Sequence, residues 1–267
     1  MIDLLKIILL GIIQGITEFL PISSTGHLIV ATQILDYQVL GATFEIFIQL
    51  GSVIAVVFYY AHDLVAQAKA IPKDSRVRNF WLYLGLAFIP AGAVGLFFGD
   101  WLEATLFNPQ VVATSLIVGG IIFLVIERLP LTEMKTEDLL AVSFKQSMGV
   151  GLCQTLALIP GVSRSGASIV GGLLVGMNRQ TATRFSFYLA IPTLGMATIY
   201  SLTKSFATLS GSDFFALGLG ALTAGITSWL VLGWLLRYIS AHNFTVFGWY
   251  RIAAGLTILS LTLIGFL

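Results

Sequence analysis

The sequence predicts an all-α polytopic membrane protein with six transmembrane helices, two re-entrant helical hairpins and an inverted-topology repeat. Apolar residues make up 57% of the 267 residues and charged residues only 10%, whereas a soluble domain carries about 25% charged residues. The mean hydropathy of +0.93 reflects the same lack of polar surface, so membrane lipids are the expected surroundings. With a net charge of +1 and no long basic stripe, the chain gives no basis for a nucleic-acid partner.

Six segments are long and apolar enough to cross a bilayer, which takes a helix of about 20 mostly apolar residues. The expected spans are residues 43–62, 80–99, 111–127, 184–203, 213–237 and 249–267. The five tryptophans lie in or beside these segments. Several of them are near span ends, where an aromatic belt is expected.

Two further apolar regions, residues 4–38 and 145–178, are each interrupted by a proline and a cluster of small polar residues. The interruptions are residues 21–26 and 160–166, and neither apolar half is long enough to cross the membrane alone. Irregular backbone survives at membrane depth only where it is buried in protein or lines a water-filled cavity. The sequence therefore predicts two re-entrant hairpins whose tips lie in the interior of the protein.

The two hairpin regions match each other, with equivalent positions 140 residues apart. The matched pairs are Gln14 and Gln154, Ser23 and Ser163, Ser24 and Arg164, Thr25 and Ser165, and Gly26 and Gly166. Each hairpin is then followed by spanning helices. We therefore expect one membrane domain, residues 1–267, made of a first repeat at about 1–128 and a second at about 140–267.

Basic residues indicate which loops face the cytoplasm, because loops on that side carry an excess of Lys and Arg. Eleven of the 14 basic residues fall into loops that would share this side: Lys69, Lys73, Arg76, Arg78, Arg128, Lys135, Lys145, Arg179, Arg184, Arg237 and Arg251. The first hairpin then enters from outside, the second enters from inside, and both termini face outward. Repeats inverted in this way place binding sites near the middle of the membrane.

Ionisable and hydroxyl side chains gather at the two tips. Glu18 and His27 flank the first tip and Arg164 lies in the second; ionisable groups inside a membrane are costly and are functional candidates. Each tip leads into a half-helix whose N-terminus attracts an anion, and Arg164 offers a bidentate fork for phosphate oxygens. The residues expected around this cavity are Glu18, Ser23, Ser24, Thr25, Gly26, His27, Ser163, Arg164, Ser165 and Ser168.

Several residues of this predicted anion site admit more than one interpretation. Gln14 and Gln154 could bind substrate or only bond across helices, and Glu45 could line the cavity or only cap and pack. His27 lies three residues beyond Ser24, near enough to take the proton of a serine nucleophile. Glu18 could orient the imidazole, accept a proton or hold a divalent metal, and His27 is itself an alternative nucleophile.

At these residues the sequence resembles the undecaprenyl-diphosphate phosphatases of bacteria, the bacitracin-resistance type. Residues 14–27 look like the family's (Glu/Gln)-x-x-x-Glu motif running into its Ser-Ser-Thr-Gly-His tract. Residues 160–168 look like its Pro-Gly-x-Ser-Arg-Ser-x-x-Thr motif. The likeness covers essentially the whole chain. Gln14 takes the amide option of the first motif, and Ser168 replaces the final threonine with another hydroxyl.

The resemblance implies an enzyme that removes the terminal phosphate of undecaprenyl diphosphate, recycles this lipid carrier for peptidoglycan synthesis and confers bacitracin resistance. It implies Glu18, Ser24, His27 and Arg164 as catalytic positions, with neighbouring hydroxyls on the diphosphate and Mg²⁺ or Ca²⁺ assisting, Glu18 being the candidate metal ligand. The implied location is the bacterial cytoplasmic (inner) membrane. Since the first hairpin is expected to enter from outside, the site is expected to open to the outer, periplasmic face. A homodimer is compatible with the resemblance.

Inverted repeats with broken helices are also the architecture of secondary transporters. The alternative function is therefore a transporter or flippase of an anionic or lipid-phosphate substrate. A transporter needs the arginine and the helix ends, but it has no need of a nucleophile beside a histidine. Release of phosphate from a polyprenyl diphosphate would separate the two functions.

Overall fold

The computed structural model describes residues 2–37, 41–129, 136–205 and 211–267, and within these ranges the regular secondary structure is helical, apart from one isolated bridge between Thr136 and Met177. The helices are α1 (Ile2–Thr17), α2 (Ser24–Leu35), α3 (Gly41–Tyr59), α4 (Ala61–Ala70), α5 (Ser75–Leu106), α6 (Pro109–Ile126), η1 (Leu139–Ala141), α7 (Phe144–Thr155), η2 (Leu156–Leu158), α8 (Arg164–Leu174), α9 (Arg179–Ser205), α10 (Gly211–Ala241) and α11 (Thr245–Leu263). The prediction of an all-α protein is confirmed. Lys135 and the end of the first hairpin region at residue 38 lie outside the described residues.

Five helices are long and apolar enough to cross a membrane, and a sixth span is counted when the bent pair α3 and α4 is taken together. The five are α5, α6, α9, α10 and α11, while α3 and α4 meet at an angle of 66°. Each predicted span therefore coincides with a helix. The first predicted span, residues 43–62, extends too far at its end, because α3 ends at Tyr59. The chain is a multi-pass membrane protein.

Side-chain caps mark the ends of several helices. Asp74 accepts from the N–H of Arg76 at the start of α5, and Asn108 accepts from the N–H of Val111 at the start of α6. Ser143 begins α7 with a complete capping box. Such caps satisfy backbone donors that the first turn leaves unpaired, which explains why long apolar stretches divide into helices at these residues.

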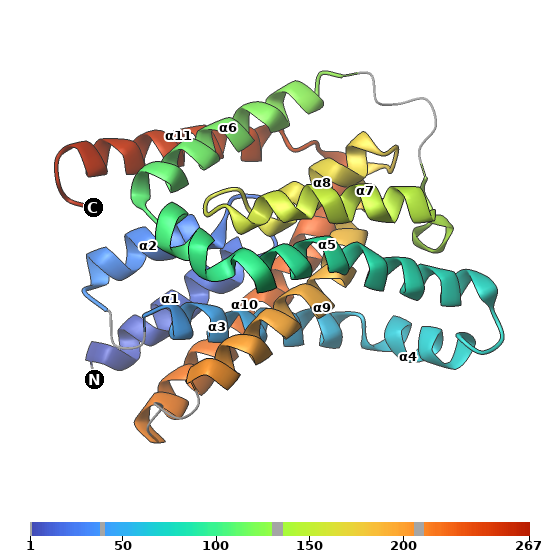
Figure 1. Cartoon of the computed structure of the whole chain (residues 1–267), viewed down its shortest axis with the longest axis horizontal. Helices are drawn as coiled ribbons and strands as arrows, with labels where there is room; N and C mark the ends of the chain where they lie inside the picture. The colour runs from blue at the N-terminus through green and yellow to red at the C-terminus, as the bar shows by residue number, and fades with distance from the viewer. Residues whose placement is uncertain (1, 38–40, 130–135, 206–210) are drawn as a thin grey trace.

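Four helices that are too short to cross a membrane, α1, α2, α7 and α8, form the two hairpins. Each has at most 16 residues, fewer than the about 20 that a span requires. Figure 1 shows the hairpins entering the bundle from opposite ends, with both termini at the end where the first hairpin enters. This arrangement agrees with the predicted threading. The inverted symmetry of the two halves, and the membrane side that each end faces, stay predictions.

The longer helices pack in a pattern that repeats between the halves. Helix α10 packs on α1 as α5 packs on α7, and α6 packs along α11. In the α6–α11 pair, a Cβ built on Gly120 would lie 2.6 Å from the carbonyl oxygen of Gly248, and one on Gly255 would lie 2.7 Å from that of Ala113. Such close approach at small residues is typical of helix pairs in membranes. A larger side chain at either glycine would push α6 and α11 apart.

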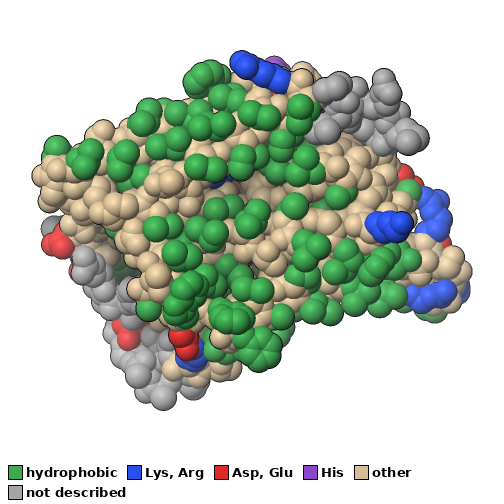
Figure 2. Space-filling model, turned by 45° about the horizontal axis from the view of Figure 1, so that its top comes forward, with side chains coloured by type: hydrophobic (Ala, Val, Ile, Leu, Met, Phe, Trp, Pro, Cys, Tyr) green, Lys and Arg blue, Asp and Glu red, His purple; other side chains and the backbone are tan. Residues whose placement is uncertain are grey.

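The surface is apolar along the helices and charged toward its edges. Figure 2 shows one face with hydrophobic side chains spread along its length and Lys and Arg side chains at the periphery. Phe58, Phe97 and Leu263 are each more than two-thirds exposed, at 71%, 77% and 79%. Apolar patches of this extent are unusual on soluble monomers, so lipid is the solvent that this surface fits.

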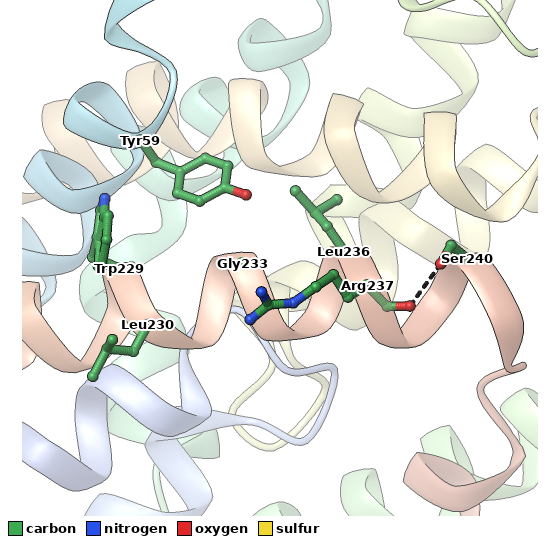
Figure 3. A pocket seen from close by; sticks show the side chains of 7 residues that line it. All are labelled: Tyr59, Trp229, Leu230, Gly233, Leu236, Arg237 and Ser240. Atoms are coloured by element: carbon green, nitrogen blue, oxygen red, sulfur yellow. Dashed lines mark hydrogen bonds between the residues drawn. The ribbon is translucent and has the colours of Figure 1, made fainter.

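Two hollows run along the α3–α10 pair and share Trp229 and Leu230. One is an apolar groove of about 620 Å³ that includes Gly51 and Gly218. The other, of about 410 Å³, continues to Arg237 (Figure 3). Neither is lined by a residue of the hairpin tips, so the hollows are separate from the site described next.

Candidate active site

The two tips share one unusual backbone conformation. Ser23 has φ 70° and ψ 100°, and Ser163 has φ 74° and ψ 118°. Residues other than glycine rarely adopt positive φ, and those that do cluster at functional sites. Each serine Oγ accepts a backbone N–H three residues on, from Gly26 at 3.5 Å and from Gly166 at 3.1 Å. The residue after each serine therefore becomes the first residue of a capped half-helix.

The carboxylate of Glu18 is the centre of the polar cluster. Its Oε1 accepts from Nη2 of Arg164 at 3.1 Å. Its Oε2 accepts from Oγ of Ser24 and from Nε2 of Gln14, both at 2.9 Å. Glu18 is 5% exposed, and a buried charge is tolerated when it is both paired and hydrogen-bonded. The structure thus brings a carboxylate and a hydroxyl of the first tip to the guanidinium of the second.

The guanidinium of Arg164 is fixed by its neighbours but keeps one donor without a partner. Nη1 donates to the carbonyl oxygen and to the hydroxyl of Ser186 in α9, at 3.0 and 3.3 Å. The guanidinium carbon lies 5.7 Å from the centre of the Phe19 ring. The buried Nε–H has no hydrogen-bond partner. Because an unpaired buried donor is unfavourable, this N–H suits a position that a ligand oxygen completes.

His27 bonds two groups other than Ser24. Its Nδ1 lies 2.8 Å from the carbonyl oxygen of Ser23, and its Nε2 lies 2.6 Å from the hydroxyl of Tyr250 in α11. A carbonyl oxygen only accepts, so Nδ1 carries the proton and Nε2 of the neutral ring accepts from the tyrosine. The two rings are also stacked, with centroids 5.6 Å apart. The base in contact with the serine hydroxyl is therefore Glu18 rather than the imidazole.

The serines of the second tip make contacts within and between the tips. Ser165 Oγ donates to the carbonyl oxygen of Leu20 in the first tip at 3.0 Å and lies 3.1 Å from Oγ of Ser163. Ser168 Oγ lies 2.6 Å from Oγ of Ser186, the residue that also holds the guanidinium. The hydroxyls of this tip therefore help to order the site, and their roles as substrate ligands stay predictions.

Gln14 and Gln154 occupy matched positions but have different partners. Gln14 bonds Glu18, four residues further along the chain. The residue four beyond Gln154 is Leu158, and Gln154 instead bonds Oγ1 of Thr193 in α9 at 3.2 Å. The second glutamine therefore connects two helices and lies outside the polar cluster.

Among the described residues, two other predicted binding residues make no polar contact with this cluster. Glu45 lies in α3, half-buried, and within the described part of the chain it forms no hydrogen bond or ion pair with a tip residue. Thr25 is half-buried in the first turn of α2, and its hydroxyl has no hydrogen bond to the tip residues that the structure describes. Their roles as substrate ligands stay predictions.

Arg251 corrects the assignment of basic residues to loops. The sequence places it in a cytoplasmic loop, but the structure buries it completely in the second turn of α11. Its guanidinium donates to the carbonyl oxygens of Pro21 and Gly161, both at 3.0 Å, one in each tip. It also donates to the carbonyl oxygens of Ser115 and Leu116 in α6, at 3.2 and 3.4 Å. The prediction fails because the partners of Arg251 are backbone groups, which the sequence does not reveal.

The oxygen atoms near Glu18 are of the kind that binds hard divalent cations. Among the described residues, no three His, Cys, Asp or Glu side chains come together. Oε1 of Gln14 is buried beside Glu18 and has no hydrogen-bond partner. Carboxylate and amide oxygens are ligands of Mg²⁺ and Ca²⁺, and Mg²⁺ often completes its shell with substrate phosphates. These residues fit a cation shared with a phosphate ligand rather than one held by protein alone.

Three residues of the cluster were not predicted as site residues: Ser186, Tyr250 and Arg251. Arg251 had a signal, because it lies within the predicted span 249–267 and a charge inside an apolar segment is a functional candidate. Ser186 and Tyr250 had none, since a single hydroxyl in an apolar helix is compatible with simple packing.

The chain is similar to known proteins over nearly its whole length. The family model described as bacitracin resistance protein BacA matches residues 7–257. An undecaprenyl-diphosphatase of Methylococcus capsulatus is 46% identical over 259 residues, covering 97% of this chain and 94% of that protein. Those of Polaromonas naphthalenivorans and Parvibaculum lavamentivorans are 46% and 44% identical, over 96% and 95% of this chain and 94% of each relative. The chain therefore belongs to the BacA family of bacitracin resistance proteins.

Proposed function

We propose that this protein is a membrane hydrolase that cleaves undecaprenyl diphosphate into undecaprenyl phosphate and inorganic phosphate. The observation that carries the proposal is the hydroxyl of Ser24, bonded at 2.9 Å to a carboxylate that is itself bonded at 3.1 Å to Arg164. A serine is a weak nucleophile unless an adjacent base accepts its proton, and phosphoryl transfer depends mainly on positioning and charge neutralisation. The names of the relatives, undecaprenyl-diphosphatases, support the choice of substrate.

In the first step, Oγ of Ser24 attacks the terminal phosphorus while its proton passes to Oε2 of Glu18. The bond from this phosphorus to the bridging oxygen breaks, and undecaprenyl phosphate leaves with the electron pair. The unpartnered Nε–H of Arg164 donates to an oxygen of the transferring phosphoryl group. The N-termini of α2 and α8 add backbone donors for the same group.

In the second step, water attacks the phosphoserine formed at Ser24. The bond between phosphorus and Oγ breaks, and Ser24 recovers its proton from Glu18. His27 is held by the carbonyl of Ser23 with its acceptor nitrogen toward Tyr250. We assign to this nitrogen the proton that the attacking water loses, passed on through the hydroxyl of Tyr250, which donates its own proton to Nε2 and takes up that of the water. The extra proton then leaves with inorganic phosphate. In this assignment Glu18 is the base of the first step and His27 is the base of the second step.

A divalent cation, Mg²⁺ or Ca²⁺, would be held by Glu18 and by the unpartnered amide oxygen of Gln14, together with oxygens of the diphosphate. When bound, such a cation neutralises charge on the phosphates. The residues of the chain bind and orient the diphosphate and move its protons as described above.

The proposed location is the bacterial cytoplasmic membrane, with the site open to its outer, periplasmic face. The first hairpin and both termini share one end of the molecule (Figure 1), and the loops predicted to be basic lie at the other. At that face the reaction would return the lipid carrier for peptidoglycan synthesis. The name of the family supports a role in bacitracin resistance.

Release of inorganic phosphate from undecaprenyl diphosphate by the purified protein in detergent tests the proposal. Ser24→Ala is expected to lower kcat by more than about 1000-fold, because an essential nucleophile is lost. Ser260→Ala is the matched control, since this exposed hydroxyl bonds only the carbonyl of Leu256 within α11, and it is expected to keep the wild-type rate.

The covalent intermediate distinguishes the two candidate nucleophiles. After acid quenching of the reaction, an acid-stable phosphate on Ser24 is expected, whereas an acid-labile phosphate on His27 would make the histidine the nucleophile. Full phosphate release by Ser24→Ala would overturn the serine mechanism. Lipid movement across vesicles by wild-type protein that releases no phosphate would support the transporter alternative.

A further inference from the structure

Arg251 joins the two hairpin tips at equivalent points. The carbonyl groups that it holds belong to Pro21 and Gly161, which are 140 residues apart, the offset that relates the other matched pairs. Nη1 donates to the first carbonyl and Nη2 to the second, each at 3.0 Å. One planar guanidinium therefore reaches both hairpins with the two arms of its fork.

Helix α6 fixes the guanidinium itself. Nε and Nη2 donate to the carbonyl oxygens of Leu116 and Ser115. Gly119 leaves the space that the guanidinium fills, because a Cβ built there would collide with it. Arg251 is fully buried, and in the described part of the chain its partners are carbonyl oxygens and not carboxylates. The side chain is thus anchored to one helix pair and directed at the tips.

The carbonyl groups held by Arg251 lie two residues before the serines with positive φ, Ser23 and Ser163. A residue other than glycine keeps such a conformation only where its surroundings over-determine it. Arg251 supplies this constraint to both tips at once. The bond from Ser165 to the carbonyl of Leu20 is a second, weaker connection between the tips, because it uses one neutral donor.

We propose that Arg251 is a positioning residue of the phosphatase, which sets the spacing of the tips so that Ser24 and Arg164 reach the same carboxylate, Glu18. The inference rests on the proposed function and adds a residue to its machinery. Arg251 acts through the backbone of the tips and not on the substrate. A displacement of about 1 Å between reacting groups costs about 100-fold in rate, so the loss of Arg251 is expected in kcat more than in KM.

Kinetics of substituted proteins in detergent test this role. Arg251→Ala is expected to lower kcat about 100-fold with KM close to wild type, and added guanidinium ion is expected to restore part of the rate by occupying the vacated space. Arg251→Lys keeps the charge, but its ammonium cannot replace the planar fork. It is expected to lie between wild type and Arg251→Ala and to show no response to guanidinium.

Arg179→Ala is the matched control for a purely structural arginine. It breaks the ion pair with the buried carboxylate of Glu127, which lies outside the tip cluster. This variant is expected to unfold at a lower temperature while kcat per folded molecule stays at the wild-type value. Arg251 variants that behave in the same way would show that the residue supports the fold alone, and would overturn the proposal.

Distances between spin labels report, without any reaction, how α2 and α8, the two helices that begin at the tips, lie relative to each other. The labels are placed at Ile34 and Leu174, exposed residues at the ends of α2 and α8, in a Cys153→Ser background. Arg251→Ala is expected to broaden the distance distribution, and guanidinium is expected to narrow it. A rate loss with an unchanged distribution contradicts the proposal.

The spin-label measurement also separates this inference from the proposed function. If Arg251→Ala fails to fold, the kinetics and the spin-label distances are measured on Arg251→Lys instead. A wild-type kcat together with a wild-type distance distribution in Arg251→Lys would overturn the role of Arg251. Wild-type protein that releases no phosphate would instead overturn the proposed function, while the distances would still decide whether Arg251 holds the tips.

Discussion

The two hairpin tips share a backbone and differ in chemistry. Ser23 and Ser163 have φ values of 70° and 74°, and each caps the half-helix that follows. The next residue is a hydroxyl in the first tip, Ser24, and a guanidinium in the second, Arg164. Both tips thus have a helix N-terminus that attracts anions, while the side chain that follows is the proposed nucleophile in one tip and a positive charge in the other. If the predicted duplication holds, the proposed catalytic site arose by divergence at single positions of one element.

The largest effect on kcat is expected from a substitution of Glu18, where the two tips meet. Glu18→Gln removes the base beside Ser24 and leaves the buried charge of Arg164 without its counter-ion. We expect kcat to fall by up to about 10⁴-fold, the upper range for loss of a general base. We also expect the free energy of unfolding to fall by about 3–5 kcal/mol, as when one partner of a buried pair is removed. Phosphate release and unfolding in mixed detergents measure the two effects.

Glu127→Gln is the control for the stability part of this change. The side chain of Glu127 is 4% exposed and pairs with Arg179, so its loss also leaves a charge without its partner. We expect a lower free energy of unfolding and an unchanged kcat per folded molecule. If Glu18→Gln reduced activity no more than Glu127→Gln does, the carboxylate at the tips would have no chemical role.

A smaller effect is expected from changing the geometry of the positive charge in the second tip. Arg164→Lys keeps the charge, but its compact ammonium lacks the planar fork with which the guanidinium contacts Ser186 and Glu18 and presents Nε–H to a phosphate. We expect kcat to fall by about 10²–10³-fold, the typical loss for one transition-state donor. A steady-state assay of phosphate release measures it, and a wild-type rate in Arg164→Lys would mean that charge alone is sufficient.

The sequence predicts the fold and the composition of the tips better than it predicts their contacts. Apolar length identifies the spans, and the 140-residue offset identifies the two tips, because both depend on residue type and order. His27 lies three residues after Ser24 on the same helix, and this spacing predicts a contact between the two side chains. The bond to Ser23 directs its ring elsewhere, since the helix starts at Ser24 and leaves that carbonyl within reach of Nδ1.

Contacts between side chains and backbone groups were also not predicted from the sequence. Arg251 bonds four carbonyl oxygens, and a carbonyl group is present at every residue, so no pattern of side chains marks its partners. Glu18 is different, because Arg164 and Ser24 are themselves distinctive residue types in apolar surroundings. Contacts between two unusual side chains can be inferred from a sequence, whereas contacts between a side chain and the backbone need the fold.

The serines with positive φ are expected to contribute equally if the tips are equivalent. Ser23→Ala and Ser163→Ala each remove a cap, which costs about 1 kcal/mol, while the strain of positive φ, about 1 kcal/mol, is the same for serine and alanine. Glycine at either position also lacks the cap but relieves this strain, so each glycine variant is expected to be about 1 kcal/mol more stable than the alanine variant. Free energies of unfolding in mixed detergents measure these differences. A large loss at one serine and none at the other would show that only one tip needs this conformation.

The smallest effect is expected at Gln154, which bonds Thr193 and not the tip residues. Gln154→Leu removes a hydrogen bond between α7 and Thr193 of α9, and such bonds between membrane helices contribute about 0.6 kcal/mol on average. The free energy of unfolding is expected to change by about this amount, with kcat unchanged. The matched substitution Gln14→Leu is expected to lower kcat and to weaken the response to Mg²⁺ or Ca²⁺, because it removes a donor to Glu18 and an unpartnered oxygen beside it. Equal losses of activity from the two substitutions would contradict the division of roles between the tips.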